Sequence, residues 1–150
     1  MIRFWKGFAV LGGSTKMAKI LTFGVYDYFH LGHLRLFEQC KKHADYLIVA
    51  VQNEDYIKAF KPEANVLYST EERVEMISAL RIVDKVIVYN TVCVAELEKI
   101  DFDILALGED HVGKRFDEIT AWCSEHGKQV VRLKRTPGIA SSQIKKELKG

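Results

Sequence analysis

Two histidines stand three residues apart, on either side of a glycine, in the first quarter of the chain. His30 and His33 share one face if a helix begins between them, because side chains three residues apart lie on the same side of a helix. Gly32 leaves no side chain between them, so an anion can approach the backbone amides at the positive end of that helix. Imidazole N–H groups there suit a phosphate whose charge grows during a reaction. The pattern favours a phosphate site, while a metal-binding pair and two ordinary surface histidines remain alternatives.

A second group of residues suited to anions lies near the end of the chain, in residues 135–142. Arg135 precedes a stiff Pro-Gly turn, and Ser141 and Ser142 begin the helix that we expect next. An arginine fork beside hydroxyl groups at a helix N-terminus makes a ready phosphate site. A simple helix cap would explain the serines but not Arg135. Two helix starts of this kind in one chain favour a ligand with several phosphates.

Four further cations have patterns that are less specific. Lys58 and Lys61 lie in a polar segment without a helical period, where a lysine can fold over a triphosphate as a point charge or simply remain solvated. Arg73 and Arg81 lie in the next predicted helix and at its end. Arg81 equally suits an interaction with the helix dipole.

An acidic segment follows the fourth predicted strand. Gly108 ends that strand, and Glu109 and Asp110 come directly after it. A carboxylate at this place can accept hydrogen bonds from ribose hydroxyls, hold a metal or cap the following helix. The residues alone do not choose among these three uses.

Strands and helices alternate along the chain, which predicts an α/β fold. A parallel sheet of about five strands, covered by helices on both faces, follows from right-handed crossovers. Ligands in such sheets bind beyond the carboxyl ends of the strands, which is where the segments above fall. We expect strands at 20–23, 46–51, 85–89, 104–107 and 129–133, helices at 31–43, 69–80, 91–100, 113–126 and 141–148, and a loop with at most one helical turn at 54–67.

The composition is that of one ordinary globular domain. The 150 residues carry 22 basic and 20 acidic side chains, a net charge of +2 that indicates neither a nucleic-acid partner nor a membrane partner. Three unpaired cysteines without zinc spacing predict reduced thiols and a cytoplasmic location. We divide the chain into an N-terminal extension of unknown role, residues 1–17, and a single domain, residues 18–150.

Two segments resemble the signatures of a known family. Residues 24–33, with Gly-Val-Tyr-Asp followed by His-Leu-Gly-His, are similar to the signature of the cytidylyltransferase-like nucleotidyltransferases. Residues 135–142 resemble the family's second signature, Arg-Thr-x-Gly-Ile-Ser-Thr-Thr. The resemblance covers about residues 18–148 and is closest in spacing to the glycerol-3-phosphate cytidylyltransferases, whose segments residues 69–73 and 108–114 also resemble. It implies a Rossmann-like α/β fold, a homodimer, and magnesium bound with the nucleotide.

The resemblance also implies roles for individual residues. The expected catalytic residues are His30, His33, Lys61 and Arg135. The expected nucleotide-binding residues are Gly24, Val25, Tyr26, Asp27, Gly108, Asp110, Thr136, Ser141 and Ser142. The expected acceptor-binding residues are Arg81, Arg73 and Lys58, and no side chain is expected to form a metal site of its own.

The reaction implied is attack by an acceptor phosphate oxygen on the α-phosphorus of CTP, with release of pyrophosphate. Glycerol 3-phosphate is the first choice of acceptor, which would make CDP-glycerol as a cell wall or capsule precursor. A heptose or other sugar phosphate, phosphoethanolamine, phosphocholine, FMN with ATP, and a non-catalytic nucleotide-binding regulatory module remain alternatives.

Three departures from the family pattern concern the acceptor more than the reaction. His111 stands where the glycerol-phosphate enzymes have tryptophan. Glu63 replaces a second loop lysine. Ala140 and the two serines after it replace Ser-Thr-Thr.

Overall fold

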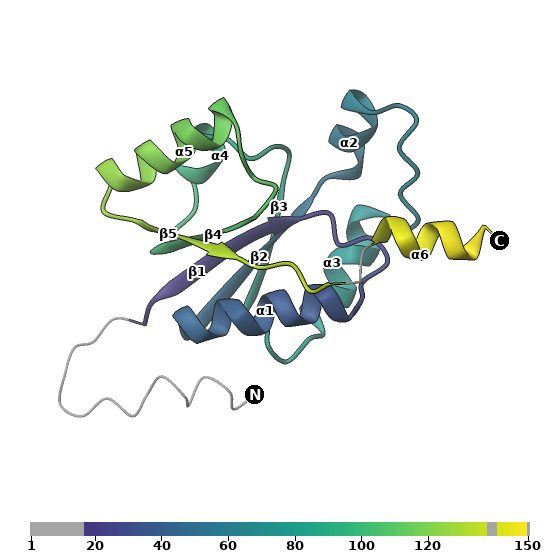
Figure 1. Cartoon of the computed structure of the whole chain (residues 1–150), viewed down its shortest axis with the longest axis horizontal. Coiled ribbons are helices and arrows are strands. Elements are labelled where there is room, and N and C mark those ends of the chain that lie inside the picture. The colour runs from purple at the N-terminus through teal and green to yellow at the C-terminus, as the bar shows by residue number, and fades with distance from the viewer. Residues whose placement is uncertain (1–16, 138–140, 150) are drawn as a thin grey trace.

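A five-stranded parallel sheet forms the centre of the protein in the computed structural model, which describes residues 17–137 and 141–149 (Figure 1). The strands lie in the order β3-β2-β1-β4-β5. Their bounds are β1 Lys19–Gly24, β2 Tyr46–Gln52, β3 Lys85–Tyr89, β4 Ile104–Gly108 and β5 Gln129–Leu133. The chain begins in the middle of the sheet, builds one edge and then returns to build the other. This confirms the predicted α/β fold and each predicted strand to within one residue at either end.

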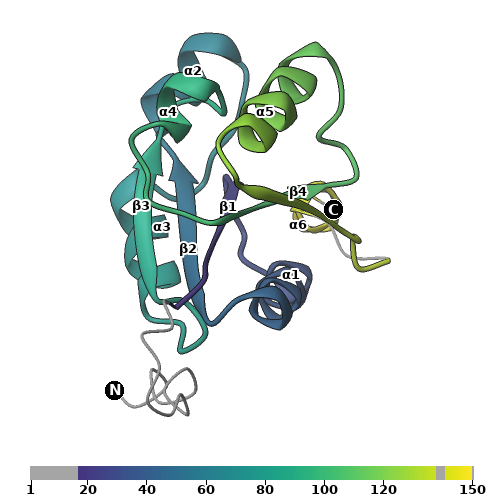
Figure 2. The same cartoon turned by 90° about the vertical axis from the view of Figure 1, so that its left-hand side faces the viewer.

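Helices cover both faces of the sheet (Figure 2). Helices α1 (Leu31–His43) and α3 (Thr70–Ser78) pack on one face, and α4 (Val94–Leu97) and α5 (Lys114–Glu125) pack on the other. Successive side chains of a strand point to opposite faces. Leu47, Val49 and Val51 of β2 therefore belong to the α1–α3 core, while Ile48 and Ala50 belong to the α4–α5 core.

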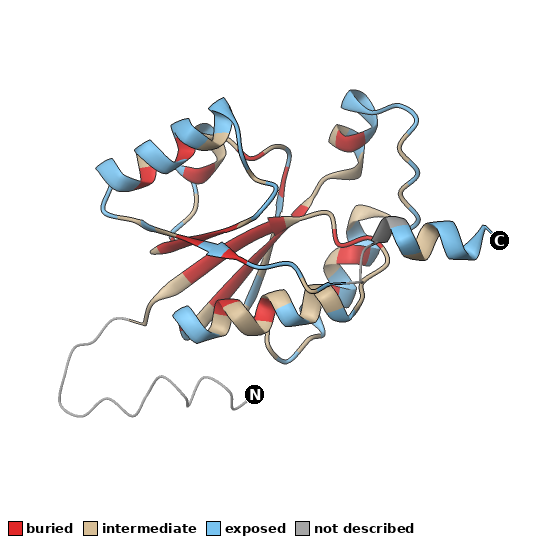
Figure 3. Ribbon diagram, viewed as in Figure 1, coloured by how far each residue is buried: buried red, intermediate tan, exposed pale blue. Residues whose placement is uncertain are grey.

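Burial follows the same division into layers. The central strands are buried along nearly their whole length, and each packed helix buries only the side that faces the sheet (Figure 3). Phe37 and Cys40 are the buried residues of α1, three positions apart as the helical spacing predicted. Continuous apolar strands with helices on either side are what a parallel sheet requires.

Two elements differ from their predicted form. A helix, α2 (Glu54–Phe60), occupies the first half of the predicted 54–67 loop, because the Asn53 side chain accepts a hydrogen bond from the Asp55 amide and so caps it. Only one turn, α4, forms within the predicted 91–100 helix. After it, the backbone hydrogen bonds span three residues instead of four, from the Lys99 amide to the Glu96 carbonyl and from the Ile100 amide to the Leu97 carbonyl. Bonds of this kind belong to the tighter 3₁₀-helix and not to the α-helix.

A buried arginine joins three backbone segments at the carboxyl edge of the sheet. Arg73 of α3 is fully buried, and its guanidinium donates to the carbonyl oxygens of Val25 at 2.9 Å, Gln52 at 2.8 Å and Tyr68 at 3.1 Å. The sequence predicted that Arg73 binds the acceptor, but in the structure its donors are directed at backbone carbonyls inside the protein. Burial lowers the pKa of the guanidinium from its usual value, and the nearby Asp27 partly offsets this effect.

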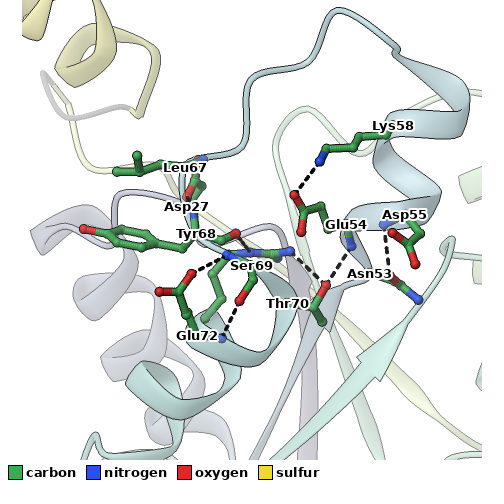
Figure 4. A network of polar contacts seen from close by, with 11 residues as sticks. Asp27, Asn53, Glu54, Asp55, Lys58, Leu67, Tyr68, Ser69, Thr70 and Glu72 are labelled. Carbon is green, nitrogen blue, oxygen red and sulfur yellow. Dashed lines mark hydrogen bonds and ion pairs between the residues drawn. The ribbon is translucent and has the colours of Figure 1, made fainter.

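Asp27 holds the other side of the same junction (Figure 4). Its carboxylate accepts hydrogen bonds from the amides of Leu67 at 2.8 Å and Tyr68 at 3.1 Å, and pairs at 3.6 Å with Lys145 of α6 (Ser141–Leu148). Asp27 is only 4% exposed. The predicted nucleotide contact by this side chain is therefore replaced by a structural one, in which Asp27 fixes the chain between α2 and α3.

We predict that Arg73→Met lowers the free energy of unfolding by about 2–4 kcal/mol, because it leaves several buried carbonyl oxygens without donors. Arg73→Lys should recover little, since one ammonium cannot reach three separate carbonyls. Urea denaturation measures both. Arg81→Met, at an exposed position shortly after the same helix, is the matched control and should change stability by less than about 0.5 kcal/mol. An equal loss of unfolding free energy in Arg73→Met and Arg81→Met would contradict a stabilising role for the hydrogen bonds of Arg73.

Candidate active site

A pocket of about 390 Å³ opens at the carboxyl edge of the sheet, where the sequence predicted a ligand site. The ends of β1, β4 and β5 and the first turn of α1 form its walls. The polar and small residues that line it are Thr22, Gly24, Val25, Tyr26, His30, Gly32, His33, Gly108, Glu109, Asp110, His111, Lys134, Arg135 and Thr136. Segments that lie more than a hundred residues apart in the sequence thus meet in one place.

The two histidines build the first turn of α1. His30 is the helix N-cap, and its Nδ1 accepts the Gly32 amide at 3.0 Å. His33 Nδ1 accepts the His30 amide at 3.2 Å, which completes a reciprocal capping box. The two rings stack with their centroids 3.8 Å apart and their planes 20° from parallel. This helix cap, made from imidazoles in place of a serine and a glutamate, fixes both rings on the pocket wall.

These backbone contacts determine the chemical state of both imidazoles. A backbone N–H can only donate, so each Nδ1 must carry a lone pair, and the ring proton of the neutral form lies on Nε2. Burial lowers the pKa of His33 to about 4, with a smaller contribution from His30, and burial also lowers the pKa of His30. Near neutral pH the site therefore holds two uncharged N–H donors and no imidazolium.

Tyr26 forms the back of the pocket behind these rings. Its backbone is left-handed, with φ of 58°, an unusual conformation for a residue with a side chain. The ring folds over Gly24, where an added Cβ would lie 2.5 Å from the ring carbon that bears the hydroxyl. The same ring packs edge-on against His33 and Phe37. Gly24 is thus required for close packing, and Tyr26 supports His33 from behind.

The turn after β4 forms the opposite wall. Arg132 of β5 donates to the carbonyl oxygens of Gly108 at 3.0 Å and His111 at 2.6 Å. Arg135 Nη2 lies 3.3 Å from the Asp110 carboxylate, an exposed ion pair that links the β4 and β5 ends. Surface pairs of this kind contribute little stability, so Arg135 can exchange its partner for a bound anion.

The structure does not bring every predicted site residue to the pocket. Lys58 pairs with Glu54 at 2.7 Å on the surface of α2, and Lys61 is exposed at the end of that helix. Neither lysine lines the pocket. Arg81 lies in the turn before β3, at the amino edge of the parallel sheet and therefore opposite the pocket. Its predicted contact with the acceptor is wrong for a site built within one chain, because the α3 helix carries it away from the carboxyl edge.

Two predicted residues fall where side chains are not described. Ser141 and Ser142 begin α6, as predicted, but their side chains lie outside the described part of the structure, as do residues 138–140. Thr136, in contrast, lines the pocket beside Arg135.

Five of the polar and small pocket residues were absent from the predicted catalytic and binding sets: Thr22, Gly32, Glu109, His111 and Lys134. Gly32 and Glu109 lie in segments that the sequence analysis had singled out. Thr22 is the single polar residue among the buried residues 20–23 of β1, a signal that the sequence does contain. His111 stood out only as a departure from the family pattern. Lys134 is brought to the wall by Gln39 of α1, whose amide accepts from the Lys134 backbone N–H at 3.2 Å and donates to its carbonyl at 2.9 Å. No local pattern announces this contact, because its partners are 95 residues apart.

The described residues form no group of three histidine, cysteine or carboxylate side chains able to hold a metal ion. The stacked histidines also have their Nδ1 atoms occupied by backbone amides. Each of these rings therefore has only its Nε2 atom left to face a ligand. In the same part of the chain, no helix is long and apolar enough to cross a membrane.

We predict that His33 in the folded protein titrates near pH 4, well below the value of about 6.5 for a histidine in an unfolded chain. Between these pH values the unfolded chain binds more protons, so stability is full above pH 6.5 and falls as the pH approaches 4. The loss from this residue is at most about 3 kcal/mol.

Nitrogen NMR of the ring measures both the tautomer and the titration midpoint, and urea unfolding at several pH values measures the stability. His33→Gln should remove this part of the pH dependence. A midpoint near 6.5 would show a solvated imidazole and contradict the buried, backbone-bonded geometry.

This chain is similar in sequence to known proteins of one family. The profile of the cytidylyltransferase-like family matches residues 21–147. The glycerol-3-phosphate cytidylyltransferase of Staphylococcus aureus is 35% identical over 136 residues, which cover 89% of this chain and 97% of that protein. The enzyme of the same name from Bacillus spizizenii is 32% identical over 134 residues, 88% of this chain and 98% of that protein.

A solved structure has the same fold. The lipopolysaccharide core biosynthesis protein from Thermoplasma volcanium superposes with a TM-score of 0.65 and 24% identity, over 81% of this chain and 98% of that one. The region that matches the family profile contains the end of β1, the histidine turn and the β5 end, which build the pocket. The chain therefore belongs to the cytidylyltransferase-like family and is a nucleotidyltransferase.

Proposed function

We propose that this protein transfers the cytidylyl group of CTP to glycerol 3-phosphate, forming CDP-glycerol and pyrophosphate. The observation that carries the proposal is the pair of neutral Nε2–H donors fixed at the N-terminus of α1 inside the pocket. Two relatives that match nearly their full length bear the name of this activity.

The phosphate chain of CTP would lie between the ends of β1 and β5. His30 and His33 offer donors on one side, and Arg135 and Thr136 lie on the other. The positive end of the α1 dipole favours an anion at the same place. The Gly24–Tyr26 turn forms the wall behind it, and Asp110 and Gly108 lie on the side left for the nucleoside.

The reaction needs no general base at the histidines. In each ring one nitrogen accepts a backbone bond and the other carries the proton, so neither has a free lone pair for a proton. A phosphate monoester is largely dianionic near pH 7 and is already a nucleophile. Its oxygen forms a bond to the α-phosphorus while the bond to the bridging oxygen of the β-phosphate breaks and pyrophosphate leaves. The site therefore suits a phosphorylated acceptor and not an alcohol.

Catalysis in this scheme comes from position and from donors that meet developing charge. The Nε2–H groups of His30 and His33 would bond the phosphate oxygens more strongly as negative charge shifts toward the leaving group. Arg135 would leave Asp110 and pair with a phosphate. Lys61, exposed at the end of α2, would reach the phosphates only by movement of the segment after α2.

Magnesium is part of the proposal as an ion carried by the nucleotide. Mg²⁺ is usually held by one or two carboxylates together with substrate phosphates and water, and does not require a ready-made cage. In this proposal the phosphates and water supply the ligands of the ion, because Glu109 and Asp110, the pocket carboxylates, lie on the nucleoside side. When bound, the ion neutralises charge on the phosphates.

We also propose that the protein is a cytoplasmic homodimer without a nucleic-acid or membrane partner. The family resemblance and the balanced net charge of +2 support this. Light scattering measures the mass in solution.

We predict that His33→Ala lowers kcat by about 10²–10³-fold, the usual loss for one donor to a transition state. His33→Gln should recover part of the activity, because the glutamine amide places an N–H donor near the position of Nε2. His126→Ala, which removes a histidine from the far end of α5, is the matched control. Steady-state release of pyrophosphate measures all three. Turnover unchanged in His33→Ala would exclude this residue from the mechanism.

The acceptor is tested by a panel of four nucleoside triphosphates against phosphorylated acceptors, with unphosphorylated glycerol as the negative control. We expect the highest kcat/KM for CTP with glycerol 3-phosphate and no product from glycerol. A preference for FMN with ATP, or for a sugar phosphate or a phosphorylated amino alcohol, would change the acceptor but keep the reaction class. If no pair of nucleotide and acceptor releases pyrophosphate, the result favours the non-catalytic regulatory module.

A further inference from the structure

Two contacts hold the ring of His111 in the pocket wall. Its Nδ1 accepts the Gly108 amide at 3.0 Å, which closes the turn after β4. One face of the ring stacks on Phe116 of α5, with centroids 5.0 Å apart and planes 18° from parallel. The side chain also lines the pocket. As in the other two pocket histidines, the accepting Nδ1 places the proton of the neutral ring on Nε2.

The Nε2–H of His111 has no hydrogen-bond partner among the residues that the structure describes. Its ring position is fixed on two sides, by the Gly108 amide and by Phe116. An unused donor on a fixed ring in a pocket wall is suited to a ligand. The remaining question is which part of the ligand it meets.

The charges around His111 do not favour the phosphates. Glu109 and Asp110 precede it in the same turn and line the pocket, and Arg132 and Arg135 lie close enough to offset these carboxylates. The β4 corner therefore offers an anion little net attraction. The N-terminus of α1, with the neutral donors of His30 and His33, attracts an anion. A nucleoside triphosphate satisfies both ends best with its uncharged half beside His111.

We propose that His111 donates its Nε2–H to an uncharged acceptor on the nucleoside half of CTP, a ribose hydroxyl or a base carbonyl, while its Nδ1 holds the turn after β4. This inference deepens the proposed function and rests on it for the identity of the nucleotide. His111 is then a specificity-determining residue, which contacts the substrate without taking part in phosphoryl transfer.

The charge state of the ring supports the geometry. Burial lowers the pKa of His111, and Arg132 of β5 and Arg135 lower it further, while Asp110 acts in the opposite direction. The neighbour packed on it from α5 is the uncharged Phe116. A neutral ring keeps the Nδ1 lone pair that the Gly108 amide requires.

Two substitutions separate the two contacts. His111→Asn places a side-chain oxygen near the position of Nδ1, so it keeps the turn but removes the Nε2 donor. His111→Gln places an amide N–H near the position of Nε2, so it keeps the donor but removes the turn contact. We expect the Kd for CTP to rise about 3- to 10-fold in the asparagine variant and to stay near the wild-type value in the glutamine variant. Hydrogen exchange at the Gly108 amide should show the reverse order, with faster exchange only in the glutamine variant.

Calorimetric titration without acceptor measures the affinities, using CTP, 2′-deoxy-CTP, 3′-deoxy-CTP and inorganic triphosphate. Loss of the asparagine effect with one deoxynucleotide identifies that hydroxyl as the partner. An effect that persists with both deoxynucleotides identifies the base carbonyl. Inorganic triphosphate should bind the wild type and the asparagine variant equally.

Unchanged CTP affinity in the asparagine variant would overturn the inference, as would an equal loss for inorganic triphosphate. These outcomes are independent of the proposed acceptor. Normal turnover of glycerol 3-phosphate by an asparagine variant with unchanged CTP affinity refutes only the role of His111. Absence of turnover in a wild-type protein that shows the His111-dependent affinity for CTP refutes only the proposed function.

Discussion

The backbone amides that donate to histidine Nδ1 atoms control the chemistry of this pocket. His30, His33 and His111 all accept such a bond, at 3.0–3.2 Å. Each bond requires a lone pair on Nδ1 and therefore a neutral ring with its proton on Nε2. Protonation of Nδ1 would replace this lone pair with an N–H that points at the backbone N–H. Burial and backbone geometry therefore both favour the neutral ring. The pocket therefore has three directional donors without positive charge, and its positive side chains are Lys134 and Arg135.

This arrangement restricts the reaction more than the presence of histidines alone suggests. Histidine is the most frequent general base in enzymes, but a ring whose two nitrogens are already committed cannot accept a proton. The nucleophile must therefore arrive as an anion, which a phosphate monoester does near neutral pH. Donors whose position is fixed before the reaction need no reorganisation when charge moves in the transition state. In the proposed reaction, the helix cap that stabilises α1 is in this way also the part of the site that favours a phosphorylated acceptor.

The sequence predicts the features that depend on short-range patterns and misses those that depend on distant partners. The strands and the histidine turn follow from apolar runs and from a three-residue spacing. Arg73 resembles an exposed helix residue in sequence, yet its burial depends on carbonyl groups 21 and 48 residues away. Arg81, eight residues later in sequence, is carried to the opposite edge of the sheet, which only the course of α3 determines. His111 becomes part of the site because β5 and α5 hold its turn, and neither contact has a local signal.

The buried charge on Arg73 has a different use from the neutral imidazoles. A buried cation is costly, and Arg73 compensates with carbonyl groups, since its guanidinium makes no hydrogen bond to a carboxylate among the described residues. What it gains is simultaneous contact with the signature turn at Val25, the end of β2 at Gln52 and the start of α3 at Tyr68. Asp27 adds the Leu67 amide to the same junction. The segment between Gln52 and Leu67, which carries Lys61, is thereby held at both ends while most of its middle faces solvent. Because both ends of this segment are fixed, its exposed middle can move without disturbing His30 and His33. Arg73 anchors the segment at Gln52 and also anchors the turn before the histidines at Val25.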